Sequence, residues 1–295
     1  MSAMSPSAYE WKDIPWHQLE QTVFKLQKRI FRASSRGDVK TVHRLQKLLM
    51  KSWSARCLAV RRVTQDNQGR RTAGVDGVKS LTPKERLILV NTLKIEPRAT
   101  PTRRVWIPKP GSTEKRPLGI PTMVNRAQQA LVKLALEPEW EAKFAPNSYG
   151  FRPGRSCHDA VEAIFIAINK LPKYCLDADI CKCFDRINHQ ALLNKLRTFP
   201  KLRRVLKTWL NAGVVDQGQL YPTTKGAPQG GVISPFLMNV ALHGLETQIK
   251  SAFPASIRVQ GKAVNTWKPE VIRYADDIVV LHRDASVIQK CQQIA

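Results

Sequence analysis

The stretch RYADDIVVL, residues 273–281, places two adjacent carboxylates, Asp276 and Asp277, inside an otherwise apolar run. The residues on both sides are mostly β-branched, which favours two short strands. A buried, unpaired carboxylate is unstable unless it takes up a proton, and two together repel each other unless a cation lies between them. The stretch therefore predicts a β-hairpin with the aspartates at its tip, either as ordinary turn residues or as ligands of a divalent metal ion.

The charge of the chain indicates the kind of partner. Its 295 residues are enough for one large domain or two, and 48 basic against 23 acidic residues give a formal net charge of +25. An excess of this size favours binding to a polyanion, above all nucleic acid. An anionic membrane is the weaker alternative, since no lipidation motif is present, and no run approaches the roughly 18 apolar residues of a membrane span.

Two further features bear on the cellular location. The amino terminus lacks the charged-then-apolar order of a signal peptide. The six cysteines form no repeated CxxC pair, so most are expected to be reduced packing residues. Both features predict a cytoplasmic protein.

Apolar residues at helical spacing predict helices along much of the chain. A first helix runs through Leu19 and Ile30, Gly37 and Asp38 end it and cap the next, and a second helix runs through Trp53. Lys and Arg occupy the other faces of both, so the chain is expected to open with a basic helical hairpin. Further helices are predicted at 124–138 (ending near Pro138), 157–171, 188–196, 202–213 and 236–249.

Short strands are expected between these helices. Residues 103–121 predict a hairpin that turns at 110–113, and its prolines favour edge strands. Residues 174–180 predict another strand, while 65–77 and 221–231 are expected to be loops, the first of them mobile and basic. Strands separated by helices favour the α+β class, with a small antiparallel sheet covered by helices.

A second carboxylate suggests what the hairpin aspartates do. In LDADICKCFD, Asp179 ends the predicted strand, where a side chain projects from the edge of a sheet. Hard divalent cations bind carboxylate, carbonyl and water oxygens together with substrate phosphates. Asp179 with Asp276 and Asp277 could therefore bind two Mg²⁺ ions, a pair that activates a 3′-hydroxyl and steadies a leaving pyrophosphate.

Six segments together resemble a known family. In chain order they are TAGVDG (72–77), IPKPGSTEKRPLGIPT (107–122), NSYGFRPGRSCHDA (147–160), LDADICKCFDRINH (176–189), KGAPQGGVISPFLMNV (225–240) and RYADDIVV (273–280). They cover most of residues 72–281. In order and spacing they resemble the reverse transcriptases encoded by group II introns, also called maturases.

The resemblance implies a metal centre with an aromatic residue nearby in the chain. Asp179 and Asp276 match the two metal-binding aspartates of the family, with the backbone carbonyl of Ile180 as a further ligand and Asp277 as a supporting carboxylate. The implied cofactors are two Mg²⁺ ions, with Mn²⁺ as a substitute. Phe184 matches the aromatic residue that walls off a ribose 2′-hydroxyl and so selects dNTPs, the alternative being plain core packing.

The resemblance also implies residues that bind the nucleotide and the template. Lys109 and Arg116 match the residues that hold the incoming triphosphate, for which ammonium and guanidinium groups are suited. Gln229 and Gly230 match a loop beside the incoming nucleotide and template. The remaining two candidates are Arg152 and Arg155, which would contact template phosphates or serve a structural role.

The implied architecture is the fingers and palm of a right-hand polymerase. Residues 1–71 form a basic helical N-terminal extension, 72–172 the fingers, and 173–295 an incomplete palm interleaved with the fingers. Members of the family continue into a thumb, so the chain is expected to be a fragment that grips primer and template poorly.

The implied function is RNA-directed DNA synthesis together with binding of intron RNA as a splicing maturase. The partners are a group II intron RNA, an RNA template with a DNA primer, and dNTPs, with no membrane. Two alternatives stay open: an RNA-binding splicing cofactor with little polymerase activity, and a reverse transcriptase associated with a CRISPR system.

Overall fold

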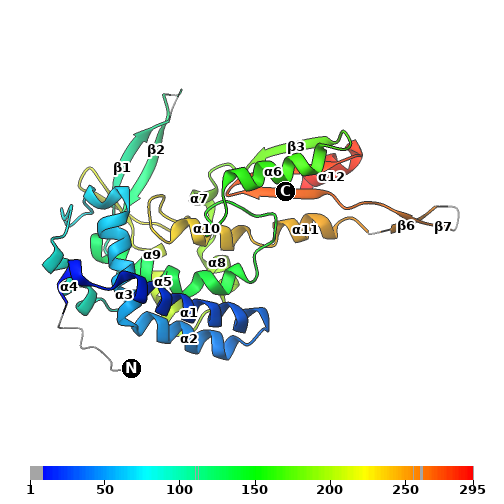
Figure 1. The fold of residues 1–295 in the computed structure, drawn as a ribbon. Helices are drawn as coiled ribbons and strands as arrows, with labels where there is room; N and C mark the ends of the chain where they lie inside the picture. The colour runs from blue at the N-terminus through cyan, green and yellow to red at the C-terminus, as the bar shows by residue number, and fades with distance from the viewer. Residues whose placement is uncertain (1–8, 110, 112, 255, 260–261, 295) are drawn as a thin grey trace. The chain divides into compact units, whose positions relative to one another are not determined.

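The computed structural model describes residues 9–294 apart from 110, 112, 255, 260 and 261 (Figure 1). The chain forms two compact units, each built from two separate stretches. We call Met1–Lys143 with Phe184–Leu237 unit 1, and Phe144–Cys183 with Met238–Ala295 unit 2. Among the described residues, no helix combines the length and apolar character that a membrane crossing needs.

Unit 1 begins with basic helices. A 3₁₀ turn at Trp11–Asp13 (η2) precedes α1 (Trp16–Ser35), α2 (Val39–Lys51) and α3 (Trp53–Arg61). The predicted boundary is confirmed, because Gly37 has a φ of 72° and the Asp38 side chain accepts a hydrogen bond from the Thr41 N–H. The second helix is shorter than predicted. Ser52 has extended backbone (φ −65°, ψ 130°), so Trp53 begins α3 instead of ending α2.

The expected basic loop at 65–77 is partly helical. A π-helical turn at Arg62–Asp66 (η3) leads into a 3₁₀ turn at Gln68–Arg71 (η4). The buried Arg126 guanidinium ties this segment down by donating to the backbone carbonyls of Gly69, Thr72 and Pro121. Helix α4 (Pro83–Thr92) follows, with a capping box between Thr82 and Glu85.

Helix α5 (Met123–Glu141) lies at the centre of unit 1 and packs against α1, α2 and α3 (Figure 1). The predicted end near Pro138 is wrong, since the helix continues through the proline. Pro138 has no N–H to donate to the carbonyl of Leu134. The side chain of Gln27 on α1 donates to that carbonyl instead, at 3.0 Å, so the helix continues without leaving the acceptor unpaired.

The sheet of unit 1 has the strand order β2-β1-β4-β5. The predicted hairpin is confirmed as β1 (Thr102–Pro108) and β2 (Lys115–Ile120), while Pro110 and Ser112 of its turn lie outside the described residues. Strand β2 is an edge strand as expected, but β1 also pairs in parallel with β4 (Val214–Asp216) at its first two residues. Strand β5 (Gln219–Tyr221) completes a small hairpin with β4 that was not predicted.

Helices complete unit 1 and lead toward unit 2. Helix α8 (His189–Leu196) occupies the predicted position, and α9 (Pro200–Leu210) begins two residues before the predicted helix and ends three residues before its predicted end at Gly213, which has a φ of 79°. In chain order, the one-turn α7 (Cys183–Arg186) precedes them and α10 (Ser234–Leu242) follows. The single helix expected at 236–249 is wrong, because Gly244 adopts a φ of 96° and separates α10 from α11 (Leu245–Ser251).

Unit 2 contains the predicted small antiparallel sheet, in the order β3-β9-β8. Its strands are β3 (Tyr174–Asp179), β8 (Glu270–Tyr274) and β9 (Asp277–His282). Helix α6 (Cys157–Ile168) packs on β8, and α12 (Ala285–Ile294) packs on β3 and β9 (Figure 1). Side chains alternate between the two faces: Ile278 and Val280 pack with α11 and α12, and Leu281 with α6. The α+β class is confirmed.

A further hairpin that was not predicted pairs β6 (Ser256–Val259) with β7 (Lys262–Asn265).

Candidate active site

Two aspartates meet at the end of the unit 2 sheet. Asp179 is the last residue of β3 and Asp277 is the first of β9, and the two are direct partners in the antiparallel register. Such partners have Cβ atoms about 4.5–5.5 Å apart. Asp276 lies next to them in the β8–β9 turn, half-buried, whereas the other two side chains are exposed. The hairpin interpretation is confirmed, and three carboxylates share one edge of the sheet.

The three carboxylates influence one another. Partial burial and then the charges of Asp276, Asp179 and Asp177 raise the pKa of Asp277 above its ordinary value. Burial, together with the negative charges of Asp276 and Asp179, raises the pKa of the Cys183 thiol to about 11. The edge therefore carries repelling negative charge that a bound cation would relieve.

The turn that carries Asp276 is held in place by buried polar contacts. Ala275 adopts a φ of 59°, and its carbonyl accepts a hydrogen bond of 2.7 Å from the guanidinium of Arg273. The same buried guanidinium donates to Asn239 Oδ1 at 3.0 Å and to Ser148 Oγ at 2.6 Å. A Cβ atom on Gly150 would lie 2.3 Å from the Ala275 nitrogen, so only glycine fits there. The position of the turn is thus fixed by contacts with distant parts of unit 2.

The donor atoms at this edge fit a hard divalent cation. The Ile180 carbonyl accepts one hydrogen bond, from the Cys183 N–H at 3.1 Å, which leaves it a second lone pair. The described residues hold no group of three or more His, Cys, Asp or Glu side chains arranged to bind a metal ion. Mg²⁺ requires less, since it keeps several waters and binds one or two carboxylates together with substrate phosphates. The oxygen donors of Asp179, Asp276 and Ile180 match that requirement.

Lys109 and Arg116 lie on the same face of the β1–β2 hairpin in unit 1. Arg116 is the register partner of Ile107, and Lys109 follows Ile107 by two residues, so the side chains of 107, 109 and 116 share one face. Arg116 is exposed, whereas the Lys109 ammonium is half-buried and forms an ion pair with Glu114. On this face, Arg116 forms no ion pair with any described residue, and a substrate would have to draw the Lys109 ammonium away from Glu114.

The loop at 226–231 connects Phe184 with the base of this hairpin. The carbonyl of the half-buried Phe184 accepts a hydrogen bond of 2.8 Å from the Ala227 N–H. The Gln229 carbonyl accepts one of 2.6 Å from the Gly119 N–H on β2. Gly230 has a φ of 102°, which favours glycine.

A pocket of about 280 Å³ opens beside this loop. Its charged and amide side chains are those of Arg104, Asp185, Lys225 and Gln229, and two threonines at 223 and 224 add hydroxyl groups. Of these, sequence reasoning identified only Gln229. Asp185 and Lys225 lie inside the quoted segments, but nothing marked these two charged residues as pocket residues, and Arg104 is one of many arginines in a basic chain.

The two arginines predicted to contact the template belong to unit 2 and donate hydrogen bonds to backbone carbonyls of that unit. Arg152 is only 7% exposed, donates to the carbonyls of Ala145 and Ser148 at 2.9 and 2.6 Å, and lies over the ring of Phe144. Arg155 is half-buried and donates to the Pro146 carbonyl at 2.6 Å. Both arrangements favour the structural alternative over a phosphate contact.

The predicted residues thus fall into two groups. Unit 2 brings together Asp179, Ile180, Asp276 and Asp277; unit 1 holds Lys109, Arg116, Phe184, Gln229 and Gly230. Sequence reasoning missed the supporting residues Arg273, Asn239 and Gly150. All three lie inside the quoted segments, but nothing in the sequence marks an arginine, an asparagine or a glycine as a support for a turn.

Comparisons with known proteins agree with the resemblance. Residues 107–295 match the family described as reverse transcriptase (RNA-dependent DNA polymerase), and residues 11–93 match the N-terminal domain of reverse transcriptase. Protein YkfC of Escherichia coli K12 is 33% identical over 270 residues, covering 81% of this chain and 71% of that protein. The group II intron-encoded protein LtrA of Lactococcus lactis subsp. cremoris is 38% identical over 160 residues, covering 52% of this chain. Maturase-like protein 1 of Euglena gracilis is 30% identical over 251 residues, covering 80% of this chain.

Some of these relatives are considerably longer. The matches span 26% of LtrA and 52% of the Euglena protein. Among solved structures, a Cas6-RT-Cas1–Cas2 complex aligns with a TM-score of 0.46 and 18% identity, covering 84% of this chain and 26% of that one. From the family match, the chain belongs to the reverse transcriptase family, and its sequence is similar to proteins described as group II intron-encoded and maturase-like.

Proposed function

We propose that the chain supplies the fingers and palm of an RNA-directed DNA polymerase that transfers nucleotides to a primer 3′-hydroxyl. Residues 1–71 would be the basic extension, 72–172 the fingers and 173–295 the palm. One observation carries the proposal: Asp179 and Asp277 are register partners beside Asp276, in a chain whose residues 107–295 match the reverse transcriptase family.

The carboxylate edge would hold the metal ions. Asp179, Asp276 and the Ile180 carbonyl are the ligands, and Asp277 supports them. Two Mg²⁺ ions bound there, or Mn²⁺ in their place, would lower the pKa of the primer hydroxyl and neutralise the leaving pyrophosphate. Arg273 keeps the turn in one conformation, so that Asp276 need not reorganise when substrate arrives.

Unit 1 residues would bind and select the nucleotide. Arg116 offers a planar guanidinium to the triphosphate, and Lys109 exchanges its Glu114 partner for a phosphate oxygen. The Phe184 ring would stand against C2′ of the sugar and exclude a 2′-hydroxyl. Gln229 and Gly230 would pack beside the incoming nucleotide, since their backbone is fixed to the hairpin base through Gly119.

The partners would be an RNA template with a DNA primer, dNTPs and a group II intron RNA bound as a splicing maturase, in the cytoplasm. The net charge of +25 and the relatives described as intron-encoded and maturase-like support the RNA partners. Arg152 and Arg155 are weaker candidates for template contact, because their guanidinium groups donate to backbone carbonyls of their own unit.

Primer extension on an RNA template with dNTPs and Mg²⁺ tests the proposal. The Asp276→Ala variant should lose extension, whereas Asp177→Asn, which removes a negative charge from β3 two residues before Asp179, should retain it. Both variants should bind template as the unchanged chain does. Equal extension by Asp276→Ala, or no extension by the folded, template-bound chain with either Mg²⁺ or Mn²⁺, would refute the assignment.

A further inference from the structure

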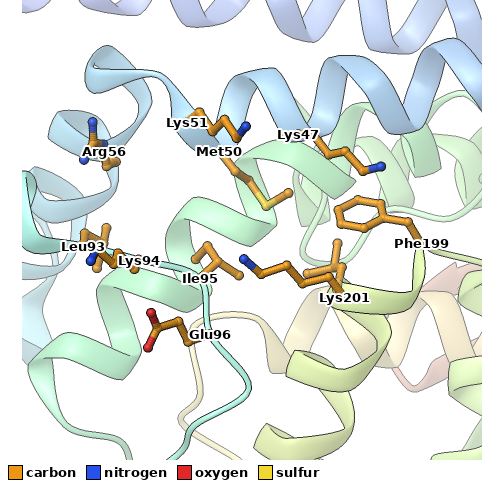
Figure 2. Close-up of a pocket in the computed structure, with 11 residues that line it drawn as sticks. Lys47, Met50, Lys51, Arg56, Leu93, Lys94, Ile95, Glu96, Phe199 and Lys201 are labelled. Atoms are coloured by element: carbon orange, nitrogen blue, oxygen red, sulfur yellow. The ribbon is translucent and has the colours of Figure 1, made fainter.

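A hollow in unit 1 combines an apolar floor with a cationic rim. It has a volume of about 340 Å³ and is formed by α2, α3, the segment at 93–96 and the start of α9. Figure 2 shows Met50, Ile95 and Phe199 directed into it, with Lys47 beside the Phe199 ring. The volume lies within the range of about 300–1,000 Å³ that small-ligand sites occupy. None of the residues assigned above to catalysis or nucleotide binding lines this hollow.

The rim of the hollow favours an anion. Five cationic side chains line it against one carboxylate, Glu96; they are Lys47, Lys51, Arg56, Lys94 and Lys201. Within the described part of the chain, none of the five forms an ion pair. The buried Arg56 Nε–H has no hydrogen-bond partner among the described residues, while Nη1 of the same guanidinium donates to the Asn91 carbonyl at 3.4 Å. A buried donor without an acceptor is costly, and a bound anionic or polar ligand could satisfy it.

The hollow continues a line of positive charge along α2. Lys40, Arg44, Lys47 and Lys51 recur at a spacing of four, three and four residues, which places them on one side of the helix. Eleven residues of helix rise about 16 Å, so the four cations are spread over that length of the helix. A second hollow along the same helix shares Lys47 and Lys51 with the first, and the buried Nε2 of His43 in its lining has no hydrogen-bond partner among the residues that the structure describes. We call Lys40, Arg44, Lys47 and Lys51 the basic stripe.

We propose that the hollow takes one base of a single-stranded RNA whose phosphates lie along the basic stripe. The flat apolar ring of a base suits the half-buried side chains of Met50 and Ile95, and a thioether makes favourable contacts with aromatic rings. The phosphate next to that base would reach Lys47 and Lys51. This inference rests on the proposed function only in that the chain binds RNA. A free nucleotide has the same chemistry, and the experiment distinguishes the two sources.

The test compares two single-stranded oligonucleotides of about twelve units with equal charge, one of uridines and one with every base removed. Base contacts contribute about 1–3 kcal/mol each, so the unchanged chain should bind the uridine strand about five- to 150-fold more tightly. Ile95→Asn should abolish most of that preference while leaving the salt dependence of binding unchanged. Ile88→Asn, the same substitution at a 61% exposed residue of α4 outside the hollow, is the matched control and should retain the preference.

Lys51→Ala tests the stripe separately. It should weaken both strands alike and reduce the slope of log affinity against log salt by about 0.7. A preference that Ile95→Asn leaves intact would overturn the inference and restrict the stripe to contacts with phosphates. Binding of free UMP at the same affinity in the chain and in Lys40→Ala would assign the hollow to a soluble nucleotide, and binding of phosphatidylserine vesicles in place of RNA would assign it to a membrane.

The outcome is separable from polymerase activity. Asp276→Ala should show the same preference for bases as the unchanged chain. A chain that shows the preference but extends no primer would support the base-binding hollow and refute the polymerase proposal. A chain that extends a primer but shows no preference would refute the hollow and leave the polymerase proposal standing.

Discussion

Arg273 is expected to stabilise the turn that carries Asp276. Replacing it by methionine measures the free energy that its hydrogen bonds contribute to the local stability of the turn. The side chain is 7% exposed, and its guanidinium donates to Ala275, Asn239 and Ser148. Burial, and then the positive charge of Arg152, lower its pKa to about 10, so it stays protonated at neutral pH. Methionine keeps the length and apolar stem of the side chain but supplies no donor.

The contacts allow the size of the effect to be calculated. Three hydrogen bonds to a charged group contribute about 1.5 kcal/mol each, or about 4.5 kcal/mol together. Removing the charge also removes its desolvation cost, which offsets a part of that sum. We expect a net loss of about 2 to 3 kcal/mol in the local stability of unit 2, equal to roughly a 30- to 150-fold faster exchange of protected amides.

Hydrogen exchange of the backbone amides is the assay. The informative amides are those of Tyr149, bonded to the Arg273 carbonyl at 2.8 Å, and of Ile180, bonded to the Asp276 carbonyl at 3.3 Å. Arg273→Lys retains the charge and one or two donors and should recover part of the protection. Arg283→Met, at an exposed arginine of the same unit, should change it little. The Mg²⁺ concentration for half-maximal extension should rise in Arg273→Met, and unchanged exchange together with an unchanged Mg²⁺ requirement would refute the reasoning.

Three further predictions concern other parts of the chain. Asp277 has a pKa raised above its ordinary value of 3.8 in the folded chain, so its negative charge destabilises the folded state at pH values above 3.8. Asp277→Asn should therefore raise the denaturation midpoint of the metal-free chain at pH 7, and this gain should vanish as the pH falls below 3.8. Gln27→Ala should cost about 1 kcal/mol in urea unfolding, but little in a Pro138→Ala background, where residue 138 regains an N–H for the Leu134 carbonyl; an equal cost in both backgrounds would refute the compensation. Phe184→Ala should relax the rejection of rNTPs during extension, and unchanged discrimination would return Phe184 to a packing role.

Local patterns predicted the elements whose cause is local. The β-branched runs on both sides of Asp276 predicted the β8–β9 hairpin, and Gly37 with Asp38 predicted a helix boundary that depends on two residues alone. Elements that depend on distant groups were not predictable. Helix α5 passes Pro138 because of Gln27, whose bond to Leu134 spans 107 positions in the sequence.

The same distinction applies to the site. The aspartates follow from the end of one strand and the start of another, both visible in the sequence. Their support does not, because Arg273 reaches Ser148 across 125 positions and the close approach of Gly150 to Ala275 exists only in three dimensions. The separate helix α11 was missed for a different reason: Gly244 interrupts an apolar run that otherwise continues the helical pattern.

The contact between Ser148 and Arg273 also affects the order in which parts of the chain can fold during synthesis. Closing a loop of 125 residues costs about 4 kcal/mol of chain entropy, and Arg273 is synthesised 125 residues after Ser148. Until both have emerged from the ribosome and met, the turn lacks the contacts that hold Asp276. We therefore expect the basic helices of a nascent chain to form well before the turn that carries Asp276 is held in place.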